Sequence, residues 1–345
     1  MATIELLGLD RADRWRSLLE ESGLGDVYHH PGYLAALAAN GDGEPRLFYF
    51  RDAGCTALHV ALWRPLSALP FAHPYADRFD AVSPYGYAGP VTDAPARAAD
   101  VWRAWAETAR ANGLVAEFIR FHPLLQNHRA FADQIEVLAA GRTIWMDLTA
   151  PIETGISKSR LRDARWATRE NVRVESSAHD RLPAFFEMYQ ATMRRKGAEA
   201  YYFFPWEYFA RLRDGLGGDF WLMRAHRGDR DCAYAICLRH RDRLHYHLSC
   251  SDEDLAQYRA VTQLLVETAR LGRDVGLTSF HLGGGYRGED SLFQFKSHFS
   301  PHQAPFFVGR ARHDPEAIAH LARLAAAAGQ AAVDPNFFPP YRSRR

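Results

Sequence analysis

Residues 280–299 read FHLGGGYRGEDSLFQFKSHF, and this stretch combines two features that decide how the surrounding sequence is interpreted. The first part, Phe280–Gly285, is an apolar run that ends in three glycines, which predicts a strand stopping in a close-approach turn. These glycines match neither the GK[ST] phosphate loop nor the GxGxxG dinucleotide fingerprint. The second part predicts a short strand or turn at 292–299, which carries Lys296 between two phenylalanines.

Predicted helices and predicted strands alternate along the rest of the chain, which is typical of the α/β class. The helices are predicted over residues 11–21, 31–40, 95–112, 158–170, 181–196, 205–215, 254–275 and 314–330. The strands are predicted over residues 46–51, 56–63, 115–121, 142–148, 171–177, 219–226, 231–240, 243–250, 277–282 and 305–311. A length of 345 residues suggests two domains. We place them at 1–150 and 151–345, because each half runs from helices through a β-meander to a helix and strand.

The composition excludes several classes of function. Hydrophobic residues make up 47% and charged residues 24%, and the net charge is +1, so global electrostatics gives no reason to expect DNA binding. The N-terminus is interrupted early by charges, and no run approaches roughly 20 apolar residues, so we expect neither a signal peptide nor membrane insertion.

The four cysteines form no CxxC pair, which favours a cytoplasmic protein. No tight Cys/His motif supplies a zinc site, so we expect no metal.

One helix, 158–170, carries an unusual row of basic residues. The spacing of Lys158, Arg162, Arg165, Arg169 and Arg173 is 4, 3, 4 and 4, which places the first four on one helical face. Like charges at this spacing repel one another and destabilise a helix by a few tenths of a kcal/mol per pair. Two interpretations stay open: a solvated face, or a surface that binds the phosphates of a substrate.

Three stretches of the second half resemble the Fem-type aminoacyltransferases, which form the peptide bridges of peptidoglycan. They are the basic helix from Ser157 that runs into the strand at 171–174, the strand HYHLSCS at 245–251, and the glycine-ended strand with its F-K-x-x-F signature at 280–299. Residues 28–34 and 83–90 resemble the family more weakly.

This resemblance implies a tandem pair of GNAT-like acyltransferase domains, of which the second carries most catalytic residues. It also implies that the protein transfers an aminoacyl group from aminoacyl-tRNA to an amine, such as a peptidoglycan precursor or a small peptide or natural-product amine. No further cofactor is expected. An N-acyltransferase that uses acyl-CoA or a carrier-bound acyl group is the alternative enzyme, and a non-catalytic binding module is a third possibility.

The resemblance assigns Phe295 and Lys296 to catalysis. In isolation Lys296 reads as a surface lysine. However, aminolysis of an ester places negative charge on the carbonyl oxygen and then on the leaving ribose oxygen, and a fixed ammonium beside them lowers the barrier. Tyr246 is expected to line the active groove, although a tyrosine on a central strand is also a common core residue.

The substrate-binding residues implied in the same way lie on the basic helix and in a loop rich in proline and glycine. Arg165 is the best candidate for an acceptor phosphate, and the loop tyrosines are candidates for covering the acceptor. The full set of helix and loop candidates is Lys158, Arg160, Arg165, Arg169, Tyr85 and Tyr87.

One absence bears on the acyl donor. CoA-dependent enzymes of this fold carry a glycine-rich pyrophosphate loop that leads into a helix, where backbone N–H groups meet the phosphates. The comparable segment here, Ser251–Ala260, has no glycine and three acidic residues. Carboxylates at this position repel a pyrophosphate, which argues against CoA in the second half.

Overall fold

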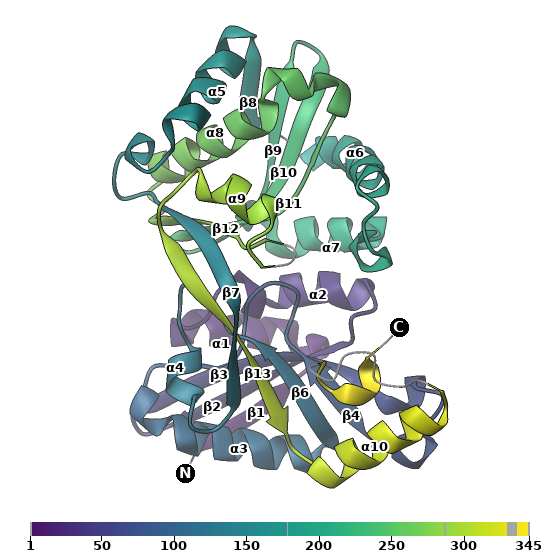
Figure 1. Cartoon of the computed structure of the whole chain (residues 1–345). Coiled ribbons are helices and arrows are strands. Elements are labelled where there is room, and N and C mark those ends of the chain that lie inside the picture. Colours follow the sequence, from purple (N-terminus) through teal and green to yellow (C-terminus); the bar gives the residue numbers. More distant parts are fainter. Residues whose placement is uncertain (1, 178, 286–287, 330–336, 344–345) are drawn as a thin grey trace. The chain divides into compact units, whose positions relative to one another are not determined.

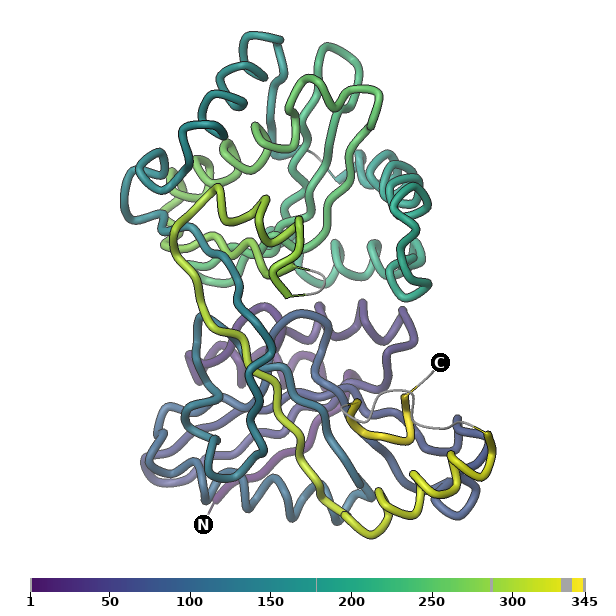
Figure 2. The backbone as a smooth tube through the Cα atoms, in the orientation of Figure 1, coloured from purple at the N-terminus to yellow at the C-terminus, as the bar shows by residue number. Residues whose placement is uncertain are grey.

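The computed structural model describes residues 2–177, 179–285, 288–329 and 337–343, and the chain divides into two compact units (Figure 1). Unit 1 consists of Met1–Ala140 and Phe306–Arg345, and unit 2 consists of Gly141–Pro305. The division differs from the predicted one at 150, because the last 40 residues return to the first unit. The strand β7 (Glu136–Asp147) carries the chain into unit 2, and β13 (Gln303–Arg312) carries it back (Figure 2).

The remaining elements of unit 1 are mostly those that the sequence predicts, with small strands added. They are β1 (Thr3–Leu7), α1 (Ala12–Ser22), α2 (Pro31–Ala39), β2 (Glu44–Asp52), β3 (Cys55–Pro65), β4 (Phe79–Val82), β5 (Val91–Thr92), α3 (Ala98–Ala111), β6 (Leu114–Arg120), α4 (His128–Phe131) and α10 (Pro315–Ala327). The sequence pattern did not predict β1, β4, β5 and α4.

Unit 2 contains the basic helix and the glycine-ended strand. Its elements are α5 (Lys158–Arg169), β8 (Val172–Ser176), α6 (Leu182–Arg195), α7 (Trp206–Leu216), β9 (Phe220–Arg227), β10 (Arg230–His240), β11 (Arg243–Ser251), α8 (Ala260–Asp274), β12 (Ser279–Gly283) and α9 (Ser291–Ser297).

The same order of elements occurs twice along the chain. Each run has a strand, two helices, three antiparallel strands, a helix, and a strand parallel to the third. In unit 1 the antiparallel strands are β2, β3 and β4, and β6 runs parallel to β4. In unit 2 they are β9, β10 and β11, and β12 runs parallel to β11. The predicted α/β class and the similar element order of the two halves are therefore confirmed.

The strands β7 and β13, which connect the two units, each pair with a strand of the other run. In unit 1, β6 pairs antiparallel with residues 308–312 of β13, and in unit 2, β12 pairs antiparallel with residues 144–147 of β7. Each unit thus includes a strand from the other run. A hydrophobic pattern identifies a strand but not its partner, which is why the sequence placed 306–345 in the second domain.

The core of unit 2 is divided between the two faces of its sheet. Met223 and Ala235 belong to the side chains that pack against α8, whereas the neighbouring residues point to the other face, where Tyr234 meets Phe185 of α6 at 6.3 Å between ring centroids. Figure 1 shows α5 and α8 on one side of β8–β11, and α6 and α7 on the other. Alternation along the strands produces these two layers.

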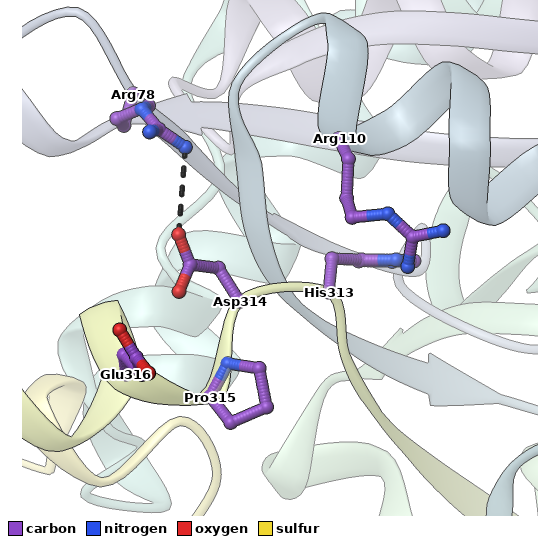
Figure 3. Close-up of a pocket in the computed structure, with 6 residues that line it drawn as sticks. All are labelled: Arg78, Arg110, His313, Asp314, Pro315 and Glu316. Carbon is purple, nitrogen blue, oxygen red and sulfur yellow. Dashed lines mark ion pairs between the residues drawn. The ribbon is translucent and has the colours of Figure 1, made fainter.

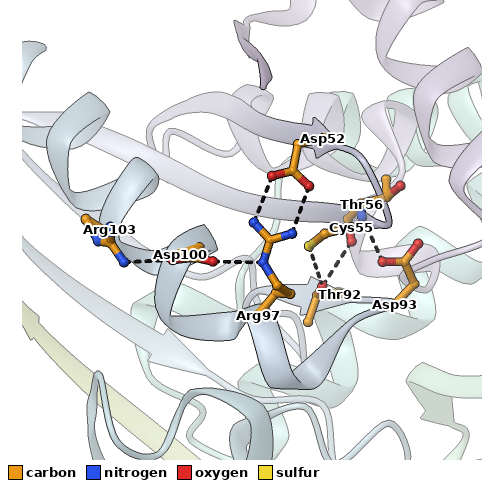
Figure 4. Close-up of polar contacts among 8 residues, drawn as sticks. All are labelled: Asp52, Cys55, Thr56, Thr92, Asp93, Arg97, Asp100 and Arg103. Atoms are coloured by element: carbon orange, nitrogen blue, oxygen red, sulfur yellow. Dashed lines mark hydrogen bonds and ion pairs between the residues drawn. The ribbon is translucent and has the colours of Figure 1, made fainter. Parts of the chain in front are cut away.

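An ion network in unit 1 ties the β2–β3 hairpin to β5 and to the start of α3 (Figure 4). Arg97 donates two hydrogen bonds to Asp52, at 3.2 and 2.8 Å, and one to Asp100 at 2.8 Å. The backbone N–H of Thr56 donates to Asp93 at 2.7 Å. The fork of the guanidinium suits a bidentate carboxylate contact, so the network fixes the register of segments distant in sequence.

The four cysteines are buried, free thiols. None of the helices in the described part of the chain has the length and apolarity that a membrane span requires.

A buried carboxylate organises the core of unit 1. Glu117 of β6 is fully buried, and one carboxylate oxygen lies 2.5 Å from His59 Nε2. The other oxygen accepts a hydrogen bond from Trp105 Nε1 at 3.1 Å and lies 3.5 Å from His313 Nε2. Burial by itself raises the pKa of Glu117, but the two histidines outweigh it and hold the pKa at about 2.

We predict that Glu117→Gln lowers the free energy of unfolding at pH 7 by about 3 kcal/mol, because it removes one partner of a buried charged network. The folded-state pKa of about 2 lies below the ordinary 4.5, so the stabilisation is present above pH 4.5 and is lost as the pH falls towards 2. Denaturant unfolding of both proteins should therefore show a difference that shrinks across this window. A difference that is constant with pH would contradict the assignment, and the exposed Asp13→Asn serves as the control.

Candidate active site

Lys296 lies on a helix where the sequence predicts a strand or turn. The helix α9 begins after Asp290, whose carboxylate accepts hydrogen bonds from the backbone N–H groups of Leu292 at 3.1 Å and Phe293 at 3.0 Å. Helical spacing then turns Phe293 and Lys296 to the same buried side and leaves Leu292 exposed. The prediction for 292–299 was wrong because an aspartate N-cap outweighed the strand-like alternation of aromatic residues.

The ammonium of Lys296 is held inside unit 2 by a backbone carbonyl. Lys296 is only 7% exposed, and its Nζ donates a hydrogen bond to the carbonyl oxygen of Gly284 at 2.7 Å. Nζ also lies 5.9 Å from the centroid of the Tyr246 ring. Burial lowers the pKa of Lys296 to about 8, although the Asp290 carboxylate opposes the shift. The lysine is thus mainly protonated at neutral pH and close to its titration midpoint.

The glycines after β12 are what direct this carbonyl towards Lys296. Gly283 has φ +75°, a conformation that favours glycine. A Cβ on Gly285 would come within 2.3 Å of an Asp290 carboxylate oxygen and of the Gly288 carbonyl oxygen. The turn therefore requires glycine for its backbone conformation and for its close contacts, as the sequence predicts.

The parallel strands β11 and β12 separate next to Lys296. Their pairing covers three residue pairs and ends at His245 with His281. On its other side β11 has an irregularity, because the register shifts: Ile236 pairs with Leu248, and the next residue, Cys237, pairs with Tyr246. Such a bulge bends the strand. Tyr246 is accordingly the first residue of β11 beyond its pairing with β12.

Tyr246 is half-buried beside the lysine. Its ring lies 6.4 Å from that of Phe280, nearly perpendicular to it. Burial raises the pKa of the Tyr246 hydroxyl, while a hydrogen bond with Ser249 acts in the opposite direction. The hydroxyl therefore remains protonated at neutral pH. The structure brings together Tyr246 and Lys296, two of the residues that the sequence singled out.

Arg160 is turned towards α9 rather than towards solvent. Its guanidinium carbon lies 5.0 Å from the centroid of the Phe295 ring, and one nitrogen lies 3.1 Å from Asp163. Phe295 itself is half-buried against the core of unit 2. The pair Arg160–Phe295 therefore connects the N-terminal turns of α5 to the helix that carries Lys296.

The other cations of α5 form an exposed row. Ala164 and Ala167 face the core, whereas Lys158, Arg162, Arg165 and Arg169 are exposed. Among the described residues, no side chain forms a hydrogen bond or an ion pair with any of these four. The predicted helix and the exposed basic face are therefore both present. Binding of a phosphate group by Arg165, Lys158 or Arg169 stays a prediction.

Tyr85 and Tyr87 lie in unit 1, in the loop that follows β4. The Tyr33 hydroxyl donates a hydrogen bond to the Tyr85 carbonyl at 2.5 Å. The Tyr87 ring meets Tyr28 edge-to-face at 5.7 Å, and a Cβ on Gly86 would come within 2.3 Å of the same Tyr28 ring. Packing inside unit 1 therefore fixes the loop. The role of these tyrosines at an acceptor stays a prediction.

The segment before α8 is irregular and acidic. It forms a 3-10 helix, Glu253–Tyr258, and passes through Arg259 at φ +57° before α8 begins. Glu253 lies 3.2 Å from Arg195, and Asp252 lies 3.7 Å from Arg230. The predicted helix 254–275 therefore begins only at Ala260. A pyrophosphate at this position would have to compete with carboxylates that already hold the nearby cations.

Within the described residues of unit 1, two neighbouring cavities are lined by no predicted site residue. One of about 530 Å³ lies at the start of α10, where Arg78 is 3.6 Å from Asp314 (Figure 3). The other, of about 270 Å³, shares Arg110 and His313 with the first. Figure 3 shows acidic and basic side chains around the first cavity, so its charges largely offset one another. The predicted catalytic residue Lys296 lies in unit 2.

A comparison with protein families finds a match within unit 2. A family model described as an acetyltransferase (GNAT) domain matches residues 157–297, which include α5, Tyr246 and Lys296. No curated protein sequence matches the chain. Unit 2 therefore carries a GNAT acyltransferase domain, and the chain is an acyltransferase.

Solved structures resemble the chain over most of its length. FemX matches 88% of this chain and 96% of its own, with 13% identity and a TM-score of 0.66. L-PGS from Bacillus licheniformis matches 96% and 97%, with 13% identity and a TM-score of 0.60. The C-terminal domain of a putative lysylphosphatidylglycerol synthetase from Agrobacterium fabrum matches 90% and 95%, with 16% identity and a TM-score of 0.55. These likenesses confirm the Fem-like tandem GNAT fold.

We predict that Lys296→Ala lowers the turnover number for acyl transfer by about 100- to 1,000-fold without unfolding the protein, because one charged donor is lost at the developing oxyanion. Since the ammonium is the active form, the wild-type rate should fall as the pH rises through about 8. Lys296→Arg, which stays charged, should keep part of the rate and lose this alkaline limb. A rate that instead rises to a plateau above pH 8 would mean that the neutral amine acts as a base. Lys196→Ala is the control.

Proposed function

We propose that the chain is an aminoacyl-tRNA-dependent aminoacyltransferase that forms an amide bond on an amine acceptor, such as a peptidoglycan precursor or a small peptide or natural-product amine. The observation that carries the proposal is the placement, in one GNAT domain, of a buried lysine and a solvent-exposed cationic helix joined by the Arg160–Phe295 contact. The first group suits a reaction that generates an oxyanion, and the second suits a donor rich in phosphates.

The reaction replaces an ester with an amide. The acceptor amine attacks the carbonyl carbon of the aminoacyl ester, a C–N bond forms, and the C–O bond to the ribose breaks. Negative charge develops on the carbonyl oxygen and then on the leaving ribose oxygen. The Lys296 ammonium has donors left after its bond to Gly284, and one of these stabilises the charge. The amine proton passes to the ribose oxygen or to solvent.

Tyr246 is placed to position the reacting groups. Its protonated hydroxyl belongs to the strand segment beyond the pairing of β11 with β12, and its ring lies beside Lys296. A phenol donates and accepts hydrogen bonds, so it can orient the acceptor amine. Because the ester supplies the driving force, no covalent enzyme intermediate is needed.

The choice of donor rests on the charges around the domain. Lys158, Arg162, Arg165 and Arg169 form a row of exposed cations on α5, whereas the segment before α8 carries three acidic residues. A polyphosphate ligand is attracted to the first surface and repelled by the second. One of the proteins with a similar fold is the C-terminal domain of a putative lysylphosphatidylglycerol synthetase. We place the activity in the cytoplasm.

The alternative is an N-acyltransferase that uses acyl-CoA or a carrier-bound acyl group. The match of residues 157–297 to an acetyltransferase domain favours it. Lys296 would act on a thioester in the same way, so the alternative differs only in the leaving group and in the surface that holds it.

We predict that purified protein transfers a labelled aminoacyl group from a charged tRNA pool to an amine, and that ribonuclease treatment of the donor abolishes the transfer. Transfer that resists ribonuclease but needs a CoA thioester would replace this proposal with the alternative. A panel of amines and peptidoglycan precursors serves as the acceptor, with product detected by mass spectrometry.

A charge reversal tests the donor surface. Arg165→Glu combined with Arg169→Glu should raise the KM for the phosphate-bearing substrate at least tenfold and leave Tm nearly unchanged, because both side chains are exposed. Added salt should weaken the wild-type interaction in the same direction. The matched control is Arg129→Glu with Arg323→Glu, two exposed arginines of unit 1 that produce the same change in net charge. An unchanged KM would show that the row is only a solvated face.

A further inference from the structure

Trp166 is an exposed tryptophan in the middle of the basic helix. The residue is 46% exposed, although α5 already packs against the core through Ala164 and Ala167. A ring this large is usually buried, and leaving it in water forfeits the stabilisation that burial would provide. The fold of unit 2 therefore does not explain why a tryptophan stands at this position.

Of its four neighbours one turn away on the helix surface, Arg162 and Arg169 are cations, and Asp163 and Glu170 are acidic. The Arg169 guanidinium carbon lies 5.9 Å from the centroid of the Trp166 ring, and Arg162 precedes Trp166 by one helical turn. Both arginines are exposed, and within the described residues neither has a side-chain hydrogen bond or an ion pair. An exposed aromatic ring flanked by two guanidinium groups matches the two parts of a nucleotide, because bases stack on aromatic rings and phosphates bind arginine.

We propose that Trp166 and the exposed cations of α5 form an RNA-binding surface, on which the indole ring stacks on an unpaired base while Arg162, Arg165 and Arg169 contact the flanking phosphates. This inference rests on the proposed function, since it names the surface that holds the tRNA donor. It also assigns a role to Trp166, which neither the family resemblance nor the row of charges includes.

The shape of the surface favours RNA over a small nucleotide. The row from Lys158 to Arg169 spans roughly 16 Å, at about 1.5 Å of rise per residue. Sites for small ligands are concave and enclose most of the ligand, whereas an isolated helix face is convex. A strand of RNA supplies one phosphate per nucleotide along such a row, and each exposed cation then has a partner.

The position of the surface also fits delivery of an aminoacyl ester to Lys296. Arg160, near the N-terminal end of α5, contacts Phe295, and Lys296 is the next residue of α9. A strand bound along α5 therefore has one end close to the catalytic helix. Trp166 lies further along α5, where it meets a base rather than the reacting ester.

Binding of fluorescently labelled, uncharged tRNA to the full chain tests the proposal. Trp166→Ala should raise Kd about 5- to 100-fold, which is the range for losing one stacked base, and Trp166→Phe should recover part of the affinity. Trp206→Ala is the matched control, because Trp206 is 38% exposed on the opposite side of the unit 2 sheet and should leave Kd unchanged.

The salt dependence of Kd separates stacking from charge. Arg162→Ala should reduce the slope of log Kd against log salt by about 0.7 to 0.9, the contribution of one phosphate contact, whereas Trp166→Ala should leave the slope unchanged. A tRNA trimmed of its unpaired 3′ nucleotides should bind wild type and Trp166→Ala with nearly equal affinity, if the stacked base belongs to that end.

Three results would overturn the proposal: an unchanged Kd for Trp166→Ala, an equal loss for Trp206→Ala, or binding of uridine and adenosine monophosphates as tight as that of tRNA. These results are distinguishable from a failure of the proposed function. If ribonuclease-sensitive transfer occurs and Trp166→Ala keeps the wild-type KM for tRNA, the function stands and the surface is wrong. If no transfer occurs but tRNA binds as described, the surface stands and the reaction is wrong.

Discussion

The hydrogen bond from Lys296 to the carbonyl of Gly284 is the interaction on which the account of this protein depends, at 2.7 Å and almost fully buried. This hydrogen bond links the end of β12 to α9. A glycine turn fixes the carbonyl, and a helix cap fixes the start of α9. Gly283 and Gly285 turn the chain, and Asp290 caps the helix. Burial lowers the pKa of the ammonium towards neutrality, so the same contact that fixes the lysine also makes its charge sensitive to pH.

Unit 2 uses positive charge in two different ways. Lys296 is single and buried, where a charge acts strongly on a reacting oxygen because little water screens it. The row on α5 consists of several exposed cations. Water and salt weaken the interaction of each one, but several together attract a polyanion. Arg160 stands between the two, stacked on Phe295 and paired with Asp163. In the function proposed above, the exposed row holds the donor and Lys296 acts on the reacting ester.

The sequence predicted the α/β class, the two similar halves and the basic helix, because these follow from local periodicity. It did not predict α9, since FQFKSHF alternates like a strand, and the signal that reveals the helix is Asp290 placed two and three residues before the N–H groups that it caps. The pairing of β7 with β12 and of β13 with β6 was not predicted, because a hydrophobic pattern does not identify the partner of a strand. Tyr246 and Lys296 lie close together as expected. The exposure of Trp166 was not predicted, because the charge pattern of α5 does not show whether a tryptophan among the cations is buried.

The most direct test of the central claim is the titration of Lys296 itself. The chain contains three lysines, Lys158, Lys196 and Lys296, so protein labelled with lysine carrying ¹³C at the ε position gives few NMR signals, and single arginine substitutions assign them. The account predicts that the signal lost in Lys296→Arg titrates with a midpoint near 8 in the folded protein. A midpoint at the ordinary value of 10.5 would show that the ammonium is not held in a buried site, and it would contradict the account.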